Sequence, residues 1–210
     1  MAKGLWLVAA YIIGCVNGGY YAVKLRSGRD IRTLGSGNAG ATNAGRLMGK
    51  RGFLVVMLFD AVKMLAALKL AALLFPGCPL IPALTMPAVL LGHVFPAQLR
   101  FRGGKGIASL VGAAAYLFNL PLIVFTALLF LLLYLVTRKY YFSGLAALAS
   151  LALSYPGSAW LLGRPIDVGM SVSLVACMAL IMAVSLRADR TVRDAAKRMG
   201  NAEDRERLAG

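Results

Sequence analysis

Long apolar stretches separated by short polar segments dominate the chain. A stretch of about 17 to 25 apolar residues is long enough to cross a bilayer as a helix. The fourth and fifth stretches would merge without FNLP at 118–121, where Asn119 favours a turn and Pro121 lacks the amide hydrogen that a helix needs. The pattern predicts an all-α integral membrane protein with about seven transmembrane helices. We expect the spans near residues 4–24, 52–75, 80–98, 106–118, 120–136, 141–162 and 168–187.

The lysine and arginine residues predict how these helices are oriented. With seven spans, Lys3 and Arg164 fall on one side of the membrane, and 19 of the 23 Lys and Arg residues fall on the other. Because cytoplasmic loops are enriched in Lys and Arg, we expect the N-terminus outside and the C-terminus in the cytoplasm. We therefore expect a single polytopic membrane domain at 1–187 and a basic cytoplasmic tail at 188–210. The basic side consists of the loop 25–51 with Lys24 at its edge, the loop 99–105, the turn around TRKYY and the tail 187–210.

The composition supports a membrane protein and argues against other classes. Hydrophobic residues make up 60% of the chain and the mean hydropathy is +0.74, which is too apolar for a soluble domain of this size. A net charge of +15 would suggest a nucleic-acid partner in a soluble protein. Here the basic residues lie between apolar stretches, so we expect anionic membrane lipids as partners and no nucleic acid. The three cysteines have no CxxC spacing, and we expect no metal site, disulfide framework or cofactor.

Two glycine-rich segments fall on the expected cytoplasmic side, GSGNAGATNAGR at 35–46 and FRGGKG at 101–106. Successive glycines let backbone N–H groups converge on an anion, and neighbouring hydroxyl, amide and cationic side chains add donors. The second segment leads straight into an apolar stretch, which places Lys105 near a helix N-terminus, where the helix dipole favours an anion. Either segment alone could serve only as a tight turn. Together they indicate phosphate binding, although the nucleotide pattern GxxxxGK[ST] is absent.

For the polar residues inside the apolar stretches, we expect structural roles. Asp60 and Lys63 lie on one face of the second expected helix, and we expect them to pair and to brace helix packing. His93 is followed five residues later by Gln98 and not by the carboxylate that would orient it as a general base, so we expect a packing or hydrogen-bonding role, with a part in shaping the second glycine segment left open. Asn17 is expected at a close helix contact.

The motifs resemble those of a known enzyme family. GSGNAGATN followed by an arginine, then DAVK, then GHVFPAQLRFRGGKGIA, resemble the bacterial acyl-phosphate:glycerol-3-phosphate acyltransferases of the PlsY family, over most of the chain up to about residue 145. The resemblance implies a seven-helix enzyme of the bacterial cytoplasmic (inner) membrane with its active site on the cytoplasmic face. Such an enzyme moves a fatty acyl chain from acyl phosphate to the 1-hydroxyl of glycerol 3-phosphate, giving lysophosphatidic acid and phosphate for phospholipid biosynthesis.

The resemblance and the anion-binding pattern together select the expected site residues. The expected catalytic residues are Ser36, Lys105 and Ser143, the last in YYFSG. Around them we expect two groups of substrate-binding residues. These are Gly35, Gly37, Asn38, Gly40, Thr42, Asn43 and Arg46 in the first segment, and Gly103, Gly104, Gly106 and His93 in or near the second.

The expected chemistry needs cations more than a strong base, because an acyl phosphate is a mixed anhydride with a good leaving group. Lys105 and the glycine amides would hold the acyl phosphate, while Arg46 and Ser36 would hold the acceptor. Members of the PlsY family carry histidine and asparagine in the C-terminal segment near the acceptor, whereas SLRADRTVRDAAKRM has neither. Three alternatives therefore stay open: a paralogue that uses another phosphorylated alcohol, a small organic-phosphate transporter, and an inactive relative.

Overall fold

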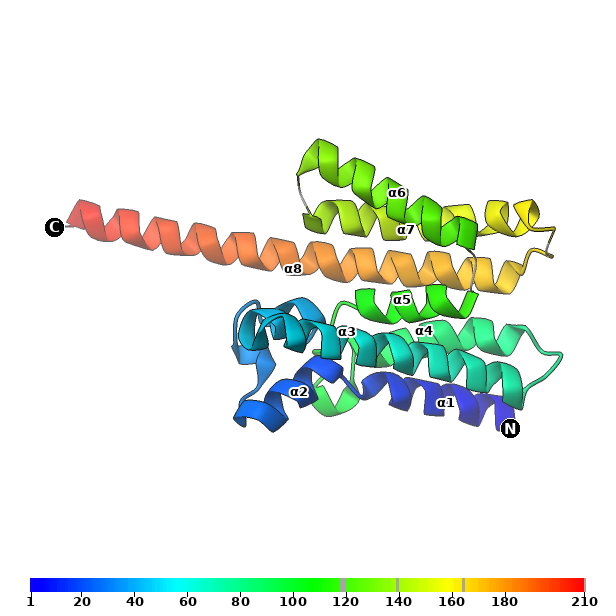
Figure 1. Cartoon of the computed structure of the whole chain (residues 1–210). Coiled ribbons are helices and arrows are strands. Elements are labelled where there is room, and N and C mark those ends of the chain that lie inside the picture. The colour runs from blue at the N-terminus through cyan, green and yellow to red at the C-terminus, as the bar shows by residue number, and fades with distance from the viewer. Residues whose placement is uncertain (118–119, 139, 164, 210) are drawn as a thin grey trace.

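The chain folds into a bundle of α-helices (Figure 1). The computed structural model describes the backbone of residues 1–117, 120–138, 140–163 and 165–209, so Asn119, Lys139 and Arg164 lie outside the described residues. Two short 3-10 helices, η1 (Ile31–Thr33) and η2 (Ala97–Leu99), lie in the connections. The α-helices are α1 (Ala2–Cys15), α2 (Gly18–Ser27), α3 (Ala41–Leu74), α4 (Leu80–Val94), α5 (Ile107–Leu117), α6 (Leu120–Thr137), α7 (Tyr140–Leu161) and α8 (Val168–Ala209).

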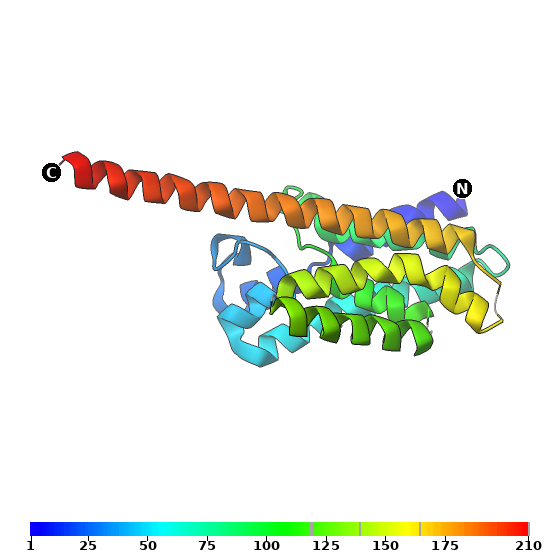
Figure 2. The ribbon, with the colours of Figure 1, turned by 90° about the horizontal axis from the view of Figure 1, so that it is seen from above.

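The long helices lie side by side and alternate in direction (Figures 1 and 2). Helix α3 contacts α4 and α5, α4 also contacts α1 and α8, and α7 lies between α6 and α8. The connections that follow α2, α4 and α6 lie at one end of the bundle, and α8 continues past that end to the C-terminus. The N-terminus lies at the opposite end. The fold thus brings the two glycine-rich segments, far apart in sequence, to the same end of the molecule.

Apolar side chains fill the centre of the bundle and also cover its outside. The central cluster combines Met64 of α3, Leu90 of α4, Leu110 of α5 and Leu174 of α8, none of them more than 1% exposed. Large apolar side chains also point outward from the helices, which suits contact with lipid tails and is costly in water. Examples are Leu5, Val8 and Ile12 on α1 and Leu128, Leu132 and Leu135 on α6.

Length and composition alone identify only part of the expected membrane topology. Within the described residues, Leu80–Leu99 and Val168–Ala188 are long and apolar enough to cross a membrane, and α1 with α2, bent by 42°, would make a third span. Helix α3 is less apolar because it contains Asp60, Lys63 and Lys69. Helix α5 has 11 residues, about 16 Å of helix. The arrangement with seven spans and its orientation stay a prediction.

The first expected span, 4–24, is interrupted in the structure. Helix α1 ends because Val16 is extended, with φ −71° and ψ 94°. Helix α2 then begins after Asn17, whose side-chain oxygen accepts a hydrogen bond from the Tyr20 amide at 3.1 Å, a typical N-cap contact. The segment before residue 52, which we expected to be a loop, is partly helical in the structure. Helix α3 already begins at Ala41, and a non-helical Gly49, with φ 72°, separates its first turns from its apolar part.

Candidate functional site

The first glycine-rich segment forms a loop and the first turns of α3, and Asn43 organises it from inside. The Asn43 side chain is fully buried. Its oxygen accepts a hydrogen bond from the Ser36 amide at 2.9 Å, and its nitrogen donates to the carbonyls of Ile31 at 3.2 Å and Leu34 at 2.9 Å. A β carbon at Gly35, where φ is +55°, would meet the Asn43 side-chain oxygen. Asn43 therefore holds the shape of the loop through contacts within the protein.

A small hydrophobic cluster supports the same loop. It is separate from the central cluster and contains residues from α2, from the loop itself and from α3. Because each member is at most 2% exposed, the loop rests on packed side chains and has a defined shape. The members are Val23, Ile31, Ala39, Ala44 and Val56.

The side chains that the first segment presents to solvent are the ones with hydroxyl or cationic groups. Ser36 lies in the loop and is exposed. Thr42 and Arg46 lie four residues apart in the first turns of α3 and are exposed as well. Residues four apart lie on the same helix face, so these two side chains are placed to act on one ligand. Asn38 is partly exposed, and Gly37 and Gly40 lie in the loop on either side of it.

The second glycine-rich segment folds back onto the end of α4. The Gly103 amide donates to the Val94 carbonyl at 3.0 Å, and the Gly104 amide donates to the His93 carbonyl at 3.1 Å. These two amides, which we expected to bind an anion, are therefore hydrogen-bonded within the protein. Lys105 follows directly, two residues before the start of α5.

Close packing explains the glycines of this second segment. A β carbon at Gly103 would meet the His93 carbonyl, and one at Gly104 would meet the His93 ring. At Gly106, where φ is +89°, it would meet the side chain of Leu90. The expected part of His93 in shaping this segment is thus visible as direct contact.

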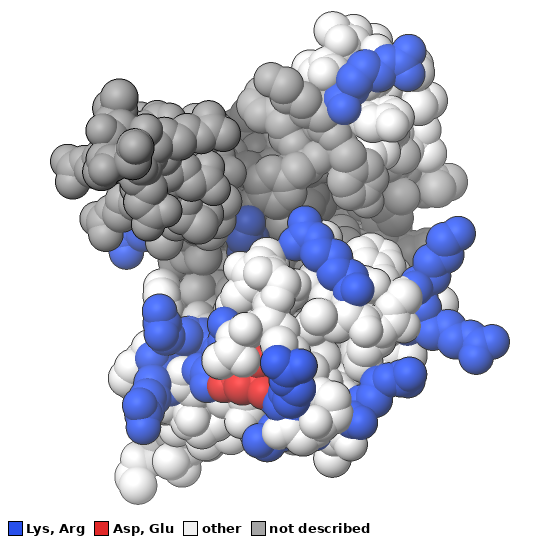
Figure 3. Space-filling view, turned by 90° about the vertical axis from the view of Figure 1, so that its left-hand side faces the viewer, with Lys and Arg blue, Asp and Glu red and all other residues white. Residues whose placement is uncertain are grey.

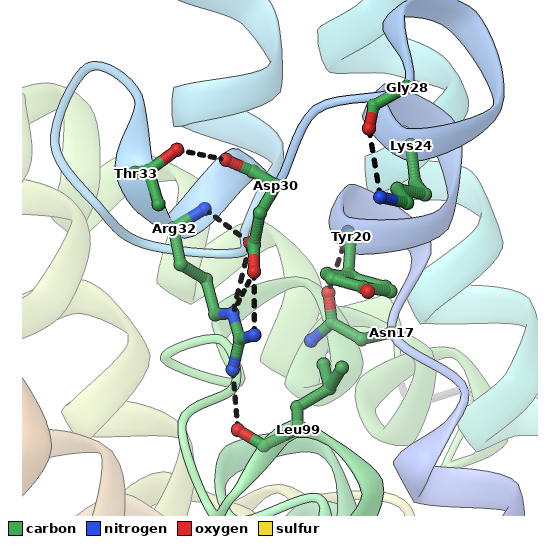
Figure 4. Close-up of polar contacts among 8 residues, drawn as sticks. All are labelled: Asn17, Tyr20, Lys24, Gly28, Asp30, Arg32, Thr33 and Leu99. Carbon is green, nitrogen blue, oxygen red and sulfur yellow. Dashed lines mark hydrogen bonds and ion pairs between the residues drawn. The ribbon is translucent and has the colours of Figure 1, made fainter.

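Arg32 links the two connections that lead into the glycine-rich segments (Figure 4). Its Nη1 donates to the Leu99 carbonyl, in the connection before the second segment, at 2.5 Å. Its Nη2 and Nε donate to the carboxylate of Asp30 at distances of 2.6 to 3.1 Å, and its guanidinium lies 5.4 Å from the centre of the Tyr20 ring. The hydrogen bonds from Arg32 lower the pKa of Asp30, and Asp30 raises the pKa of Arg32. The glycine motifs gave no sign of this pair, because it precedes them in the chain.

Ser143 lies apart from these two segments in sequence but at the same end of the bundle. It is in the first turn of α7, and the connection between α6 and α7 lies at the end that holds the glycine-rich segments (Figure 1). The residue is buried, and its hydroxyl oxygen lies 3.1 Å from that of Thr137, the last residue of α6. A catalytic role for Ser143 stays a prediction.

The expected pairing of Asp60 and Lys63 is confirmed, and it includes a third residue. Lys63 Nζ lies 2.8 Å from Asp60 Oδ1 and 2.9 Å from His93 Nδ1. All three side chains are buried.

Lysine and arginine side chains are spread over the described part of the end of the molecule that holds these segments (Figure 3). Among the described residues in this view, the acidic surface is limited to a red patch between blue side chains, and much of the rest is white and uncharged. A basic surface of this kind attracts anions and lowers the cost of bringing two negatively charged groups together. The site thus combines exposed donors with a field that favours phosphate groups.

A family model described as glycerol-3-phosphate acyltransferase matches residues 4–194 of the chain. The chain belongs to this glycerol-3-phosphate acyltransferase family. One relative, glycerol-3-phosphate acyltransferase 1 of Desulfitobacterium hafniense (strain Y51), is 36% identical over 177 residues, which cover 83% of this chain and 84% of the relative. Another, glycerol-3-phosphate acyltransferase of Myxococcus xanthus (strain DK1622), is 34% identical over 173 residues, which cover 82% of this chain and 88% of the relative.

Solved acyltransferase structures share the fold. The crystal structure of PlsY (YgiH), an integral membrane glycerol 3-phosphate acyltransferase, in its glycerol 3-phosphate form matches with a TM-score of 0.74 and 27% identity, covering 94% of this chain and 93% of that one. Its lysophosphatidic acid form matches with a TM-score of 0.72 and 26% identity. The resemblance to the PlsY family is confirmed, and with it the all-helical membrane architecture.

Proposed function

We propose that this acyltransferase moves a fatty acyl chain from acyl phosphate to the 1-hydroxyl of glycerol 3-phosphate. The observation that carries the proposal is that two glycine-rich segments lie at one basic end of the bundle, with Arg32 linking the connections that lead into them. Both substrates are phosphate esters or anhydrides, so both need cationic and hydroxyl donors in one place. The relatives named glycerol-3-phosphate acyltransferase, and the PlsY structure in its glycerol 3-phosphate form, support the acceptor.

Side chains, more than the glycine amides, would hold the two phosphates. The amides of Gly103 and Gly104 are hydrogen-bonded to α4, and the Ser36 amide is hydrogen-bonded to Asn43. We therefore assign the acceptor phosphate to Arg46, with the Ser36 hydroxyl, and the acyl phosphate to Lys105. Arginine suits the first role because its planar donors match a phosphate group. Lys105 would stabilise the charge that develops on the carbonyl oxygen and on the leaving phosphate.

The proposed reaction is a direct acyl transfer. The acceptor hydroxyl oxygen attacks the carbonyl carbon of the acyl phosphate, and the bond between that carbon and the bridging oxygen breaks. Inorganic phosphate leaves with the electron pair of the broken bond, and the hydroxyl proton passes to a substrate phosphate. No step needs a strong protein base, which agrees with the burial of His93 behind the second segment.

The membrane gives this reaction its location. We place the basic end in the cytoplasm, beside anionic lipids of the inner membrane, where soluble glycerol 3-phosphate can meet an acyl phosphate whose chain lies in the bilayer. The outward apolar side chains of the helices support this arrangement.

Purified protein in detergent tests the proposal. With acyl phosphate and glycerol 3-phosphate it should release inorganic phosphate and form lysophosphatidic acid. Lys105→Ala should lower kcat on the order of 100-fold, as expected when a group that stabilises an oxyanion is removed. Lys3→Ala, an exposed lysine at the opposite end of the bundle, is the matched control and should behave as wild type.

Two results would overturn the proposal. Equal use of acyl-CoA would remove acyl phosphate as the specific donor, and full activity of a folded Lys105→Ala variant would remove the proposed role of this residue. A panel of other phosphorylated alcohols, tested with one acyl phosphate, decides the acceptor. Faster turnover of any of them than of glycerol 3-phosphate would identify the chain as a paralogue.

A further inference from the structure

The break between α1 and α2 leaves backbone groups that side chains from other helices satisfy. Three successive carbonyls, of Gly14, Cys15 and Val16, each accept a hydrogen bond from such a side chain. Lys63 Nζ donates to the first at 3.1 Å and to the third at 2.8 Å, and Gln98 Nε2 donates to the second at 2.6 Å. Backbone polar groups within a membrane bundle need partners of this kind, because lipid offers none. Lys63 is therefore a structural part of the broken helix, although it belongs to α3.

Lys63 is itself held by Asp60 and His93. One carboxylate oxygen, Asp60 Oδ1, lies 2.8 Å from Lys63 Nζ and 3.6 Å from His93 Nδ1, and it accepts a hydrogen bond from the Gly18 amide at 3.3 Å. His93 Nδ1 lies 2.9 Å from Lys63 Nζ, so the imidazole is in direct contact with the lysine. The other ring nitrogen, Nε2, lies on the Gly104 side.

This buried trio contacts the second glycine-rich segment directly and reaches the first through Gly18 and Gly19 of α2. Next to Gly18, a β carbon at Gly19 would meet the Ala39 carbonyl in the first segment. On the other side, the His93 ring lies against Gly104 in the second segment, so closely that a β carbon there would be 2.9 Å from Cε1 of the ring. The trio is thus connected to the second segment through the His93 ring and to the first through Gly18 and Gly19, so a displacement of Lys63 would bear on both.

We propose that Lys63, held by Asp60 and His93, is a positioning residue that sets the placement of the two glycine-rich segments relative to each other. Its role extends beyond the bracing of helix packing, because a brace between α3 and α4 would not need to bond to the carbonyls at the C-terminal end of α1. The kinetic part of this proposal rests on the proposed function, since it concerns how the two substrates are aligned. The structural part concerns the two segments themselves and can be measured without turnover.

The kinetic test compares two lysines of one helix. Lys63→Met keeps most of the apolar length of the side chain but removes every donor, whereas Lys69→Met alters an exposed lysine further along α3 and serves as the control. We expect Lys63→Met to lower kcat and to raise the KM for glycerol 3-phosphate, with a loss in kcat/KM on the order of 10- to 100-fold, because small displacements of reacting groups have effects of that size. The measurement is made at a temperature where thermal unfolding curves show both variants to be folded.

The two possible roles of Lys63 give different results in this comparison. A lysine that only stabilises the fold would lower the unfolding temperature and leave kcat and KM of the folded protein unchanged, and that result would overturn the proposal. If Lys63→Met does not fold, His93→Gln replaces it, because this change keeps an acceptor for Lys63 but removes the ring behind Gly104. Wild-type kcat and KM in a folded His93→Gln protein would likewise overturn the proposal.

A distance measurement tests the placement directly. Thr33 and Phe101 are exposed residues near the first and second segments. Each is replaced by cysteine and spin-labelled in a variant whose three native cysteines are alanine, and the distance distribution between the labels is measured by pulsed electron resonance. We expect Lys63→Met to broaden or shift the distribution and Lys69→Met to leave it unchanged. An unaltered distribution in Lys63→Met would refute the proposal, whereas a shift in a protein with no acyltransferase activity would support it while the proposed function fails.

Discussion

At the scale of single residues, the glycine motifs indicated which residues to consider for a phosphate site but not how each is used in the fold. Ser36, Thr42 and Arg46 are exposed as a binding role requires, whereas Asn43 directs its hydrogen bonds inward. A sequence cannot separate these cases, because an asparagine that binds a ligand and one that holds a loop have the same neighbours in the chain. Arg32 shows the opposite case, a contact that local sequence does not indicate, because its partner Leu99 is 67 positions away.

The link made by Arg32 predicts that arginine cannot be replaced by lysine at this position. The guanidinium reaches the Leu99 carbonyl and the Asp30 carboxylate at the same time, while a lysine ammonium is a single point of charge. We expect Arg32→Lys to lower kcat/KM on the order of tenfold, about 1.4 kcal/mol. Arg29→Lys, an exposed neighbour with the same change in chemistry, is the control. Equal kinetics for both variants would contradict a joining role for Arg32.

The pair of Asp30 and Arg32 also predicts that the stability of the first glycine-rich segment depends on pH. Because the pKa of Asp30 is lowered in the folded protein, the pair contributes stability above the ordinary aspartate pKa of about 4, and this contribution is lost as the pH falls through the lower folded value. The contribution is expected to stay below about 1 kcal/mol, because the pair is partly exposed. Hydrogen exchange at the amides of the first segment should therefore speed up in acid beyond its intrinsic rate. The same experiment on Asp30→Asn should show no such extra change.

The contact between His93 and Gly104 predicts that a methyl group added at Gly104 will lower the rate of acyl transfer. In Gly104→Ala the new β carbon would collide with the buried imidazole, so the segment that carries Lys105 must shift. We expect a loss of acyl transfer on the order of 100-fold, with Gly4→Ala, where nothing lies within 4 Å, as the control. Retention of wild-type turnover by Gly104→Ala would show that the ring can move aside.

At the scale of helices, the apolar pattern predicted most of the helical segments, and the exceptions have a common cause. Helices α4, α6, α7 and the start of α8 lie close to the expected ranges. The break at Val16 was not expected, because the groups that satisfy it, Lys63 and Gln98, come from other parts of the chain. Local sequence reports helix preference, whereas a break inside a bundle depends on partners that only the fold supplies.

Helices α1 and α4 cross at a pair of glycines, so we expect a larger side chain at either glycine to lower the stability of the protein. A β carbon at Gly92 would meet the Tyr11 carbonyl, and one at Gly14 would meet the Val89 carbonyl. We expect Gly92→Ala to destabilise the protein by about 1–3 kcal/mol, because backbone atoms have little room to retreat. Thermal unfolding in detergent measures this change, with Gly157→Ala in α7 as the control. An unfolding temperature equal to that of the control would disprove the tight crossing.

At the scale of the whole molecule, the distribution of charge agrees with the arrangement of the helices. The connections after α2, α4 and α6 lie at the end of the bundle from which α8 extends. The described basic segments of the chain lie at this same end. The orientation in the membrane remains a prediction from these charges.

Labelling of single cysteines in intact cells tests that orientation. In a variant without native cysteines, a thiol reagent that cannot cross the membrane should react with Leu162→Cys, in the connection between α7 and α8. It should react with Thr33→Cys and Phe101→Cys only after the cells are opened. Reaction of Leu162→Cys and Thr33→Cys under the same condition would show that the expected number of crossings is wrong.

The packed support beneath the first glycine-rich segment has a consequence for inhibitor design. Because Val23, Ile31 and Val56 fix the backbone that carries Ser36, little conformational entropy remains to be lost when an anion arrives. A rigid phosphonate that matches this preformed surface should gain affinity over a flexible compound with the same charged groups. Most of that gain is expected in the entropy of binding, where titration calorimetry would reveal it.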